Sequence, residues 1–457
     1  PILQKYKTWK TPKEWVDFVK QHPLGPNVIS FLGHSDLRTS VMGLSRATDK
    51  AIRPTESEMN QMEGILSEAL DQGFLGLSSM CLTWDKVDGD REWSKSLPST
   101  YAKWKEINRL NQLLRRSNRV HQGAPNAANP LQIFQYLKET LGMLRQPLKT
   151  TLITLMDLRG NATVRPMAQL VSKVANFFGG DFRWQVLPTP FTVYADGIDV
   201  VFFEEFGAGE MALDLKNEVE RNSLLKDEDY RRKFRKFYGE KLSPRVWQRD
   251  FADAMIIHCP DESIIGKNFD EVAKERGIHV VDLFLDLVVE FGRSLRWYTT
   301  VGNHRRDVLE RMVQDKNTLI TFSDAGAHIR NMAFYNLPLR FLKMIKQSHD
   351  KGQALMTMEK AVWRMTGEQA DWLGINAGKI RQGDRADITI INPEMFDQNL
   401  EEVHWATMEN FELERLVNRN PGLVEHVIIN GKPAIENEKF SADFGKNMGY
   451  GAFLPAK

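Results

Sequence analysis

Residues 318–324 read Thr-Leu-Ile-Thr-Phe-Ser-Asp, a run of β-branched and apolar residues that stops at a carboxylate. Comparable short runs recur earlier in the chain, and amphipathic stretches with helical period separate them. Strands that alternate with helices in this way imply parallel strands joined by crossover helices. The sequence therefore predicts an α/β fold in which Asp324 lies at the carboxyl end of a strand.

The number of candidate strands favours one α/β architecture. A closed barrel of parallel strands needs eight of them, whereas we find about seven candidates and none before residue 27. We therefore predict a TIM-like (β/α)8 barrel whose first strands are missing from this chain. An open sheet is the alternative, although no glycine-rich phosphate loop follows an early strand. The candidate strands lie at 27–32, 73–77, 119–122, 150–156, 183–187, 254–258 and 318–322.

The pattern changes along the chain and predicts two domains. Residues 1–375 are predicted to form the barrel, with a helical insertion near 206–250, where Arg, Lys and Glu are frequent. A solvated helical face is the alternative reading of that composition. Residues 376–457 contain strand-like runs with Asn and Gly at their turns. They are predicted to form part of a β-sandwich and a C-terminal tail.

Charge and cysteine content limit the class of partner. The 61 Lys and Arg nearly cancel the 60 Asp and Glu, so no global field attracts nucleic acid or a membrane surface. A small molecule is the expected partner, and a homo-oligomer is left open. Cys81 and Cys259 are too few for a disulfide framework, which is typical of a reducing compartment, so we expect a cytoplasmic protein. No apolar run reaches the roughly 18 residues of a membrane-spanning helix.

Three stretches carry a resemblance to a known family. Residues 366–387 read TGEQADWLGINAGKIRQGDRAD, residues 33–43 read GHSDLRTSVMG, and residues 321–328 read TFSDAGAH. The first stretch resembles the segment that joins barrel and β-sandwich in the amidohydrolase superfamily. The others resemble the N-acyl-D-amino-acid deacylases, or D-aminoacylases, of that superfamily. The resemblance implies a metal-dependent hydrolase that cleaves the amide bond of an N-acyl amino acid or a related small amide.

One element of the family pattern is missing from this sequence. The family carries His-x-His on its first barrel strand, where it supplies metal ligands, and no His-x-His occurs among the ten histidines here. The resemblance therefore implies an amino-terminal fragment or small subunit that carries this motif. Proteolytic processing before Pro1 or a separate coding sequence would account for it. Simple removal of an initiator methionine is the alternative explanation for a chain that starts at Pro1.

Asp324 is the strongest candidate for catalysis. It follows a strand at the end where barrel enzymes place their active sites, and it matches the family's catalytic aspartate. By resemblance, Asp324 takes a proton from a metal-activated water, passes it to the leaving nitrogen and also binds the metal. A carboxylate that caps the next helix is the alternative.

His121 is the second candidate metal ligand. It lies near the position of the family's fifth-strand histidine, although it could be out of register. Gln122 would be a weak substitute for one of the family's barrel histidines. Asp157 could bind the metal, and a pairing with Arg159 is its alternative. With Asp324 and His121 as ligands, we expect one zinc ion rather than two.

Three residues are predicted to bind substrate. His34 and Arg38 follow the strand at 27–32, and Arg grips a carboxylate through two parallel hydrogen bonds. A buried histidine that braces the barrel is an equal alternative for His34. His328 is predicted to face the same mouth as Asp324, with a structural role in a first helical turn as its alternative.

Two other functions are left open, because His121, Gln122 and Asp157 do not reproduce the family's barrel histidines. The first is a lyase or cyclase of amidohydrolase fold that uses Asp324 and His34 as acid and base on a natural-product-like substrate, since fold does not determine function. The second is a non-catalytic binding subunit whose metal ligands have been lost.

Overall fold

In the computed structural model, which describes residues 7–457 apart from 127–130, 144, 241–244, 325 and 410–411, six strands form one parallel sheet. Within the described residues β1 and β9 are its two edge strands. The predicted α/β class is confirmed, and closure into a barrel stays a prediction. The strands, in their spatial order, are β1 (Leu32–Gly33), β2 (Gly76–Met80), β3 (Val120–Ala124), β4 (Lys149–Leu152), β5 (Asp181–Gln185) and β9 (Thr318–Leu319).

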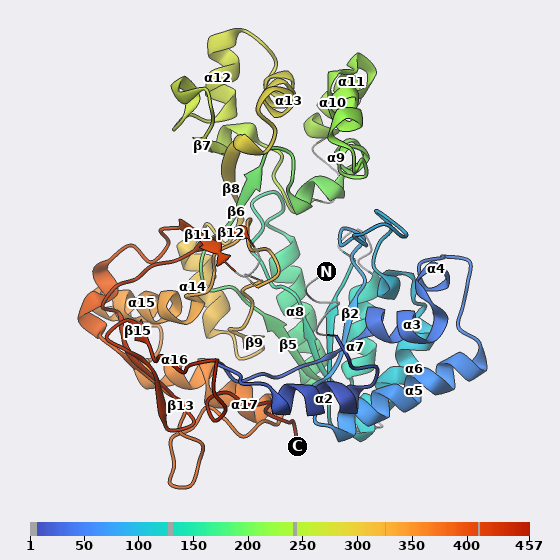
Figure 1. The fold of residues 1–457 in the computed structure, drawn as a ribbon, viewed down its shortest axis with the longest axis vertical. Coiled ribbons are helices and arrows are strands. Elements are labelled where there is room, and N and C mark those ends of the chain that lie inside the picture. Colours follow the sequence, from blue (N-terminus) through green and yellow to red (C-terminus); the bar gives the residue numbers. More distant parts are fainter. Residues whose placement is uncertain (1–6, 127–130, 144, 241–244, 325, 410–411) are drawn as a thin grey trace.

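Helices lie before, between and after these strands in the chain and surround the sheet (Figure 1). The start of α5 shows how the sequence specifies them: the Thr55 hydroxyl accepts from the Glu58 backbone N–H at 3.2 Å, and the Glu58 carboxylate accepts from the Thr55 N–H at 2.7 Å. The helices are α2 (Pro12–Gln21), α3 (His34–Met42), α4 (Leu44–Ala47), α5 (Glu56–Asp71), α6 (Trp104–Arg116), α7 (Leu131–Thr140), α8 (Val164–Phe177), α14 (Arg306–Gln314), α15 (Leu337–Asp350), α16 (Met358–Met365) and α17 (Gly367–Leu373), with the short η1 (Pro98–Tyr101).

The two faces of the sheet differ in character. Leu77, His121 and Phe182 lie on one register row of the sheet, and all three are buried. This face packs against the helices, since the His121 ring lies 5.2 Å from the Tyr136 ring on α7. The neighbouring row, which includes Gln122, points to the opposite face because successive strand residues alternate. On that face, the Gln122 side chain donates to the Ser78 hydroxyl at 3.2 Å.

Residues 191–302, which lie between β5 and β9, form the lobe at the top of Figure 1. Its sheet has the order β6-β8-β7 and is antiparallel. Aromatic side chains such as Trp247, Trp297, Phe203 and Phe284 fill its core. The elements are β6 (Phe191–Asp196), η2 (Val201–Glu205), α9 (Gly207–Leu213), α10 (Glu218–Lys226), α11 (Glu228–Gly239), η3 (Phe251–Asp253), β7 (Met255–His258), η4 (Glu262–Ile264), α12 (Phe269–Arg276), α13 (Val280–Phe291), η5 (Gly292–Ser294) and β8 (Arg296–Gly302).

This lobe corrects one sequence-based strand assignment. The candidate strand at 254–258 is β7, which pairs with β8 and does not join the parallel sheet. The predicted insertion near 206–250 lies within the larger segment 191–302. The parallel sheet therefore has one described strand fewer than the sequence predicted.

The C-terminal part of the chain is rich in antiparallel strands. One sheet has the order β10-β13-β14-β15, and β11 pairs with β12. The last residues return to the start of the parallel sheet, where the Leu454 N–H donates to the Val28 carbonyl at 2.9 Å. Gly73 allows this approach, because a Cβ there would lie 2.3 Å from Pro455. The elements are β10 (Ile388–Ile391), η6 (Pro393–Asp397), β11 (His404–Met408), β12 (Leu413–Val417), β13 (Val424–Ile429), β14 (Lys432–Glu436) and β15 (Lys439–Phe440).

Among the described residues, no helix combines the length and the apolar character that crossing a bilayer requires.

Candidate active site

Asp324 lies in the loop that follows β9, beyond the carboxyl end of the sheet. Its backbone has φ of 51°, in the left-handed region, and its carbonyl accepts from the Ala327 and His328 N–H groups at 3.2 and 3.1 Å. Non-glycine residues in this region are uncommon and are found at turns and functional sites. The Asp324 side chain keeps 39% of its surface exposed, so it can be reached by a small molecule.

Asp324 is linked electrostatically to His328 and to Asp85. The His328 Nε2 atom lies 3.8 Å from an Asp324 carboxylate oxygen. Partial burial raises the pKa of Asp324, and the His328 charge opposes that rise. Burial also raises the pKa of Asp85, in the loop after β2, where His328 lowers it and the Asp324 charge raises it. We call Asp85, Asp324 and His328 the rim cluster.

The loop that carries Asp85 is held against the upper lobe. The Lys86 ammonium lies 2.9 Å from the Glu210 carboxylate on α9 and 3.4 Å from that of Glu204. Farther along the loop, the Trp93 indole donates to the Asp214 carbonyl at 2.8 Å. The lobe therefore helps to fix the position of the loop that brings Asp85 to the rim cluster.

A second polar cluster lies on the helix-facing side of the sheet. The Ser79 hydroxyl lies 3.1 Å from His121 Nε2 and 3.2 Å from His34 Nδ1. On its other side, His34 Nε2 lies 2.8 Å from a carboxylate oxygen of Glu106, and Arg38 donates to the second oxygen. His34 and His121 are fully buried, and Arg38 is almost so. We call these five residues the helix-side cluster.

Glu106, which the sequence analysis did not single out, is the charged centre of the helix-side cluster. Burial alone would raise the pKa of Glu106, but the hydrogen bonds and charges of His34 and Arg38 outweigh it and lower the pKa. The geometry is that of a histidine that braces the sheet, the alternative that the sequence left open. A substrate carboxylate would have to compete with Glu106 for Arg38.

One ring nitrogen of His121 has no hydrogen-bond partner in the described part of the chain. Its Nδ1 is buried without a hydrogen bond among the described residues. Burial, reinforced by the charge of His34, lowers the pKa of His121 to about 3. The imidazole is therefore neutral at ordinary pH, as a metal ligand must be. However, it faces the helices, and β4 and β5 lie between its strand and β9, so the structure does not bring His121 and Asp324 together.

Asp157 follows β4 and is already bound by arginine. Its carboxylate accepts from Arg305 Nε at 2.8 Å and lies 3.4 Å from Arg165 Nε. Burial would raise the pKa of Asp157, but the hydrogen bond and charge of Arg305 outweigh it and lower the pKa. The Arg159 side chain, two residues after Asp157, binds Asp253 instead.

The described residues do not fit a complete zinc site by themselves. Across the parts of the chain that the structure describes, no three His, Cys, Asp or Glu side chains are grouped as a metal site would require. The donor set at the rim offers carboxylates and one imidazole that is 3.8 Å from Asp324. Without a metal, the rim cluster provides one partly desolvated base, Asp324, together with the Asp85 carboxylate and the His328 imidazole.

No sequence model of a protein family matches the chain. Uncharacterized proteins of Mycobacterium bovis and of Mycobacterium tuberculosis H37Rv are each 43% identical to it over 464 aligned positions, which cover 99% of this chain and 76% of the relative.

Solved structures share the fold. A D-aminoacylase described as having a binuclear metal centre superposes with a TM-score of 0.56 at 18% identity, over 97% of this chain and 75% of that protein. N-acyl-D-glutamate deacylase from Bordetella bronchiseptica, solved with zinc and a phosphonate inhibitor, superposes with a TM-score of 0.52 at 18% identity, over 94% of this chain and 72% of the other. The fold is thus that of amidohydrolases.

Proposed function

Because this chain belongs to one family with the uncharacterized mycobacterial proteins and has an amidohydrolase fold, we propose that it is an amide hydrolase with Asp324 as the catalytic base. The substrate class that we propose is an N-acyl amino acid or a related small amide. This substrate class is supported by two enzymes that share the fold, a D-aminoacylase and an N-acyl-D-glutamate deacylase.

The observation that carries the proposal is the setting of Asp324. Its carboxylate lies beyond the carboxyl end of a parallel strand, where α/β barrels place catalytic groups. Partial burial raises the pKa of Asp324 above the ordinary aspartate value, which makes the carboxylate a stronger base. Its left-handed backbone, with φ of 51°, marks it as a constrained position.

The chemistry assigned to these residues is a proton transfer through one carboxylate. A water oxygen attacks the amide carbonyl carbon while Asp324 accepts a proton from that water. Asp324 then returns the proton to the amide nitrogen, the C–N bond breaks, and a carboxylic acid and an amine leave. His328, whose Nε2 lies 3.8 Å from Asp324, is proposed to contact the substrate on the same side.

His34 and Arg38 have a different place in the proposal. Both bind Glu106 inside the helix-side cluster, so we assign them to holding α3 and α6 against β2. This keeps the loop after β2, and with it Asp85, at the rim. A direct grip on the substrate carboxylate, as predicted from the sequence, would require the Glu106 pairing to open.

We propose that the zinc ligands other than Asp324 lie in a segment outside residues 7–457, on the same or on a separate polypeptide. Two more strands between β9 and β1 would complete an eight-stranded barrel, and the family's His-x-His lies on the first barrel strand. Intact-mass and elemental analysis of the active protein test this. We expect one zinc per protein together with a His-x-His segment. Full activity without zinc and without such a segment would overturn it.

The catalytic assignment is tested with the full-length polypeptide on N-acetyl-D- and N-acetyl-L-amino acids, by measuring release of the free amine. We expect Asp324→Asn to lower kcat/KM by about 10²–10⁴-fold, because an amide cannot accept the proton. The matched control is Asp307→Asn on α14, where the carboxylate is 70% exposed. This control should stay within about twofold of wild type. Wild-type rates in Asp324→Asn, with the control also unchanged, would remove Asp324 from the mechanism.

A further inference from the structure

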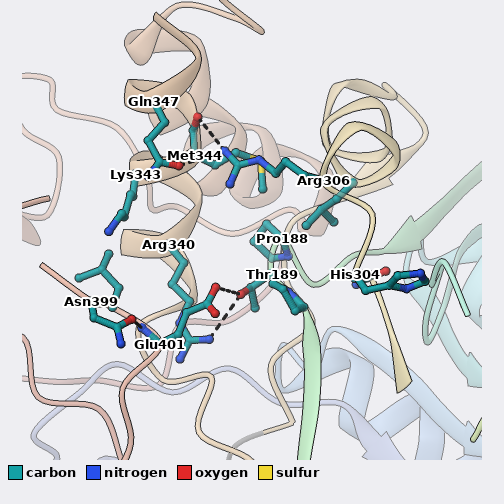
Figure 2. A pocket seen from close by; sticks show the side chains of 14 residues that line it. Pro188, Thr189, His304, Arg306, Arg340, Lys343, Met344, Gln347, Asn399 and Glu401 are labelled. Atoms are coloured by element: carbon teal, nitrogen blue, oxygen red, sulfur yellow. Dashed lines mark hydrogen bonds between the residues drawn. The ribbon is translucent and has the colours of Figure 1, made fainter. Parts of the chain in front are cut away.

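A cationic cavity lies between α15 and the loops that follow β5 and η6 (Figure 2). Its volume is about 380 Å³, the size of many small-ligand sites. One face of α15 lines it, because residues three and four apart share a helix face. Arg340 and Lys343 stand on this face, opposite Thr189 and Glu401. We call it the Arg340 cavity.

Arg340 is the unusual residue of this cavity, because it is a buried charge without a salt bridge. Only 8% of its surface is exposed. Its guanidinium donates to the Asn336 side chain at 2.7 Å, to the Ala333 carbonyl at 3.0 Å and to the Thr189 hydroxyl at 3.4 Å. These partners are neutral, and the described residues contribute no salt bridge to Arg340. Burial lowers the pKa of Arg340, and the charge of Glu401 opposes that effect.

Lys343 adds a second cation one turn along α15. Its ammonium donates to the Gln398 carbonyl at 2.6 Å, and no described carboxylate forms a salt bridge with it. Arg306, across the cavity, is instead paired with Glu310 at 2.7 Å. A buried or half-buried charge left with neutral partners is costly unless an anion joins it. A negatively charged ligand beside Arg340 and Lys343 would therefore reduce this cost.

The remaining lining limits which anion fits. Glu401 is the carboxylate of the cavity wall, and it accepts from the Thr189 hydroxyl at 3.1 Å. The negative charge of Glu401 repels a dianion such as phosphate more strongly than it repels a monoanion. Leu309, Met344 and Leu400 provide apolar wall.

A second cavity continues from the first. It shares Pro190, Arg340 and Glu401 with the Arg340 cavity and has a volume of about 190 Å³. Tyr194 and Phe334 lie in its wall. Together the two cavities offer a charged end and an aromatic extension, which suits an amphipathic ligand.

We propose that the Arg340 cavity binds a small organic carboxylate, with the carboxylate between Arg340 and Lys343 and an apolar body along Leu309 and Met344. None of the residues of the rim cluster lines this cavity. The site is therefore additional to the proposed hydrolytic centre and does not depend on it.

The test is calorimetric titration of the full-length protein with benzoate, with its neutral isostere benzamide and with inorganic phosphate. We expect saturable binding of benzoate, with benzamide and phosphate each at least about tenfold weaker. Lys343→Met is expected to weaken benzoate about tenfold, because one charge-assisted hydrogen bond is lost. Lys346→Met, on the same helix but paired with Asp350 at 2.7 Å, is the matched control and should bind as wild type does.

The alternatives give different outcomes. Equal binding of benzoate and benzamide would show an apolar pocket without anion recognition and would overturn the proposal. Phosphate that binds while benzoate does not would overturn the carboxylate assignment. Equal effects of Lys343→Met and Lys346→Met would place the anion on the general surface charge of α15, which would also overturn it. Arg340→Lys, which keeps the charge, is expected to retain part of the benzoate affinity.

Discussion

The helix-side cluster and the rim cluster are built from the same kinds of side chain on one parallel sheet, yet their surroundings differ. In the helix-side cluster the charges are enclosed and paired, with 4% of the Glu106 side chain exposed. In the rim cluster the Asp324 side chain is 39% exposed, and the His328 Nε2 atom lies 3.8 Å from its carboxylate. Pairing lowers the pKa of Glu106, whereas partial burial without a close cation raises the pKa of Asp324.

This difference separates stabilising from reactive groups. A buried carboxylate such as Glu106, whose two oxygens bind His34 and Arg38, holds secondary-structure elements together, and its lowered pKa makes it a weaker base. A carboxylate with a raised pKa and open access can take a substrate proton. Histidines and carboxylates found by pattern alone belong to both clusters, so their surroundings decide which role each has.

Among the changes that test this difference between the two clusters, Glu106→Gln is expected to have the largest effect, on the free energy of unfolding. Removing the charge leaves Arg38 buried without its counter-ion, which costs about 3–5 kcal/mol in the free energy of unfolding. Urea unfolding monitored by circular dichroism measures it. The control Glu275→Gln removes an exposed partner of Lys267 and should change stability by about 0.5 kcal/mol or less. A loss below about 1 kcal/mol in Glu106→Gln would mean that this network does not stabilise the fold.

Much of the parallel sheet is readable from the sequence, because strand signals are local. The runs at 119–122 and 183–187 overlap β3 and β5. The strands β6 and β8 were not among the predicted strands, and the pairing of two strands, such as Tyr194 of β6 with Tyr298 of β8, has no local signal. For the same reason β7, which pairs only with β8 in its sheet, was assigned to the wrong sheet.

The site residues show a sharper limit. The place of Asp324 beyond the carboxyl end of a parallel strand could be predicted, because a carboxylate after an apolar run is a local pattern. The face that His121 occupies could not, because a shift of one residue moves a strand side chain to the other side of the sheet. Here His121 faces the helices and its neighbour Gln122 faces the opposite side. Glu106 and Asp85 were missed because only tertiary contacts bring them to their clusters.

The second largest expected effect is a dependence of folding stability on pH that arises from His121. Its pKa is about 3 in the folded protein against 6.5 as the ordinary value, so between these pH values the unfolded chain binds a proton that the folded protein does not. Stability is therefore lost as pH falls, by about 2 kcal/mol from pH 7 to pH 5. Urea unfolding at both pH values should show this loss in wild type and a smaller loss in His121→Asn.

The control for this measurement is His404→Asn, at a histidine whose side chain is 43% exposed. It should keep the wild-type pH dependence. Other groups that titrate in this range, including the carboxylates of the rim cluster, contribute alike to wild type and variants and cancel in the difference. Identical pH dependence in His121→Asn and wild type would show that His121 is not held neutral by burial.

The smallest expected effect is a change in the pKa of Asp324 within the rim cluster. The charge of His328 lowers the pKa of Asp324, against the larger influence of burial, which raises it. Removing that charge in His328→Gln leaves burial unopposed, so the pKa of Asp324 should rise further. As the base must be ionised, the acid limb of the kcat/KM profile should move to higher pH, by about one unit or less. A purely structural His328 would change the rate without moving the limb, and a shift to lower pH would contradict the assigned contact between His328 and Asp324.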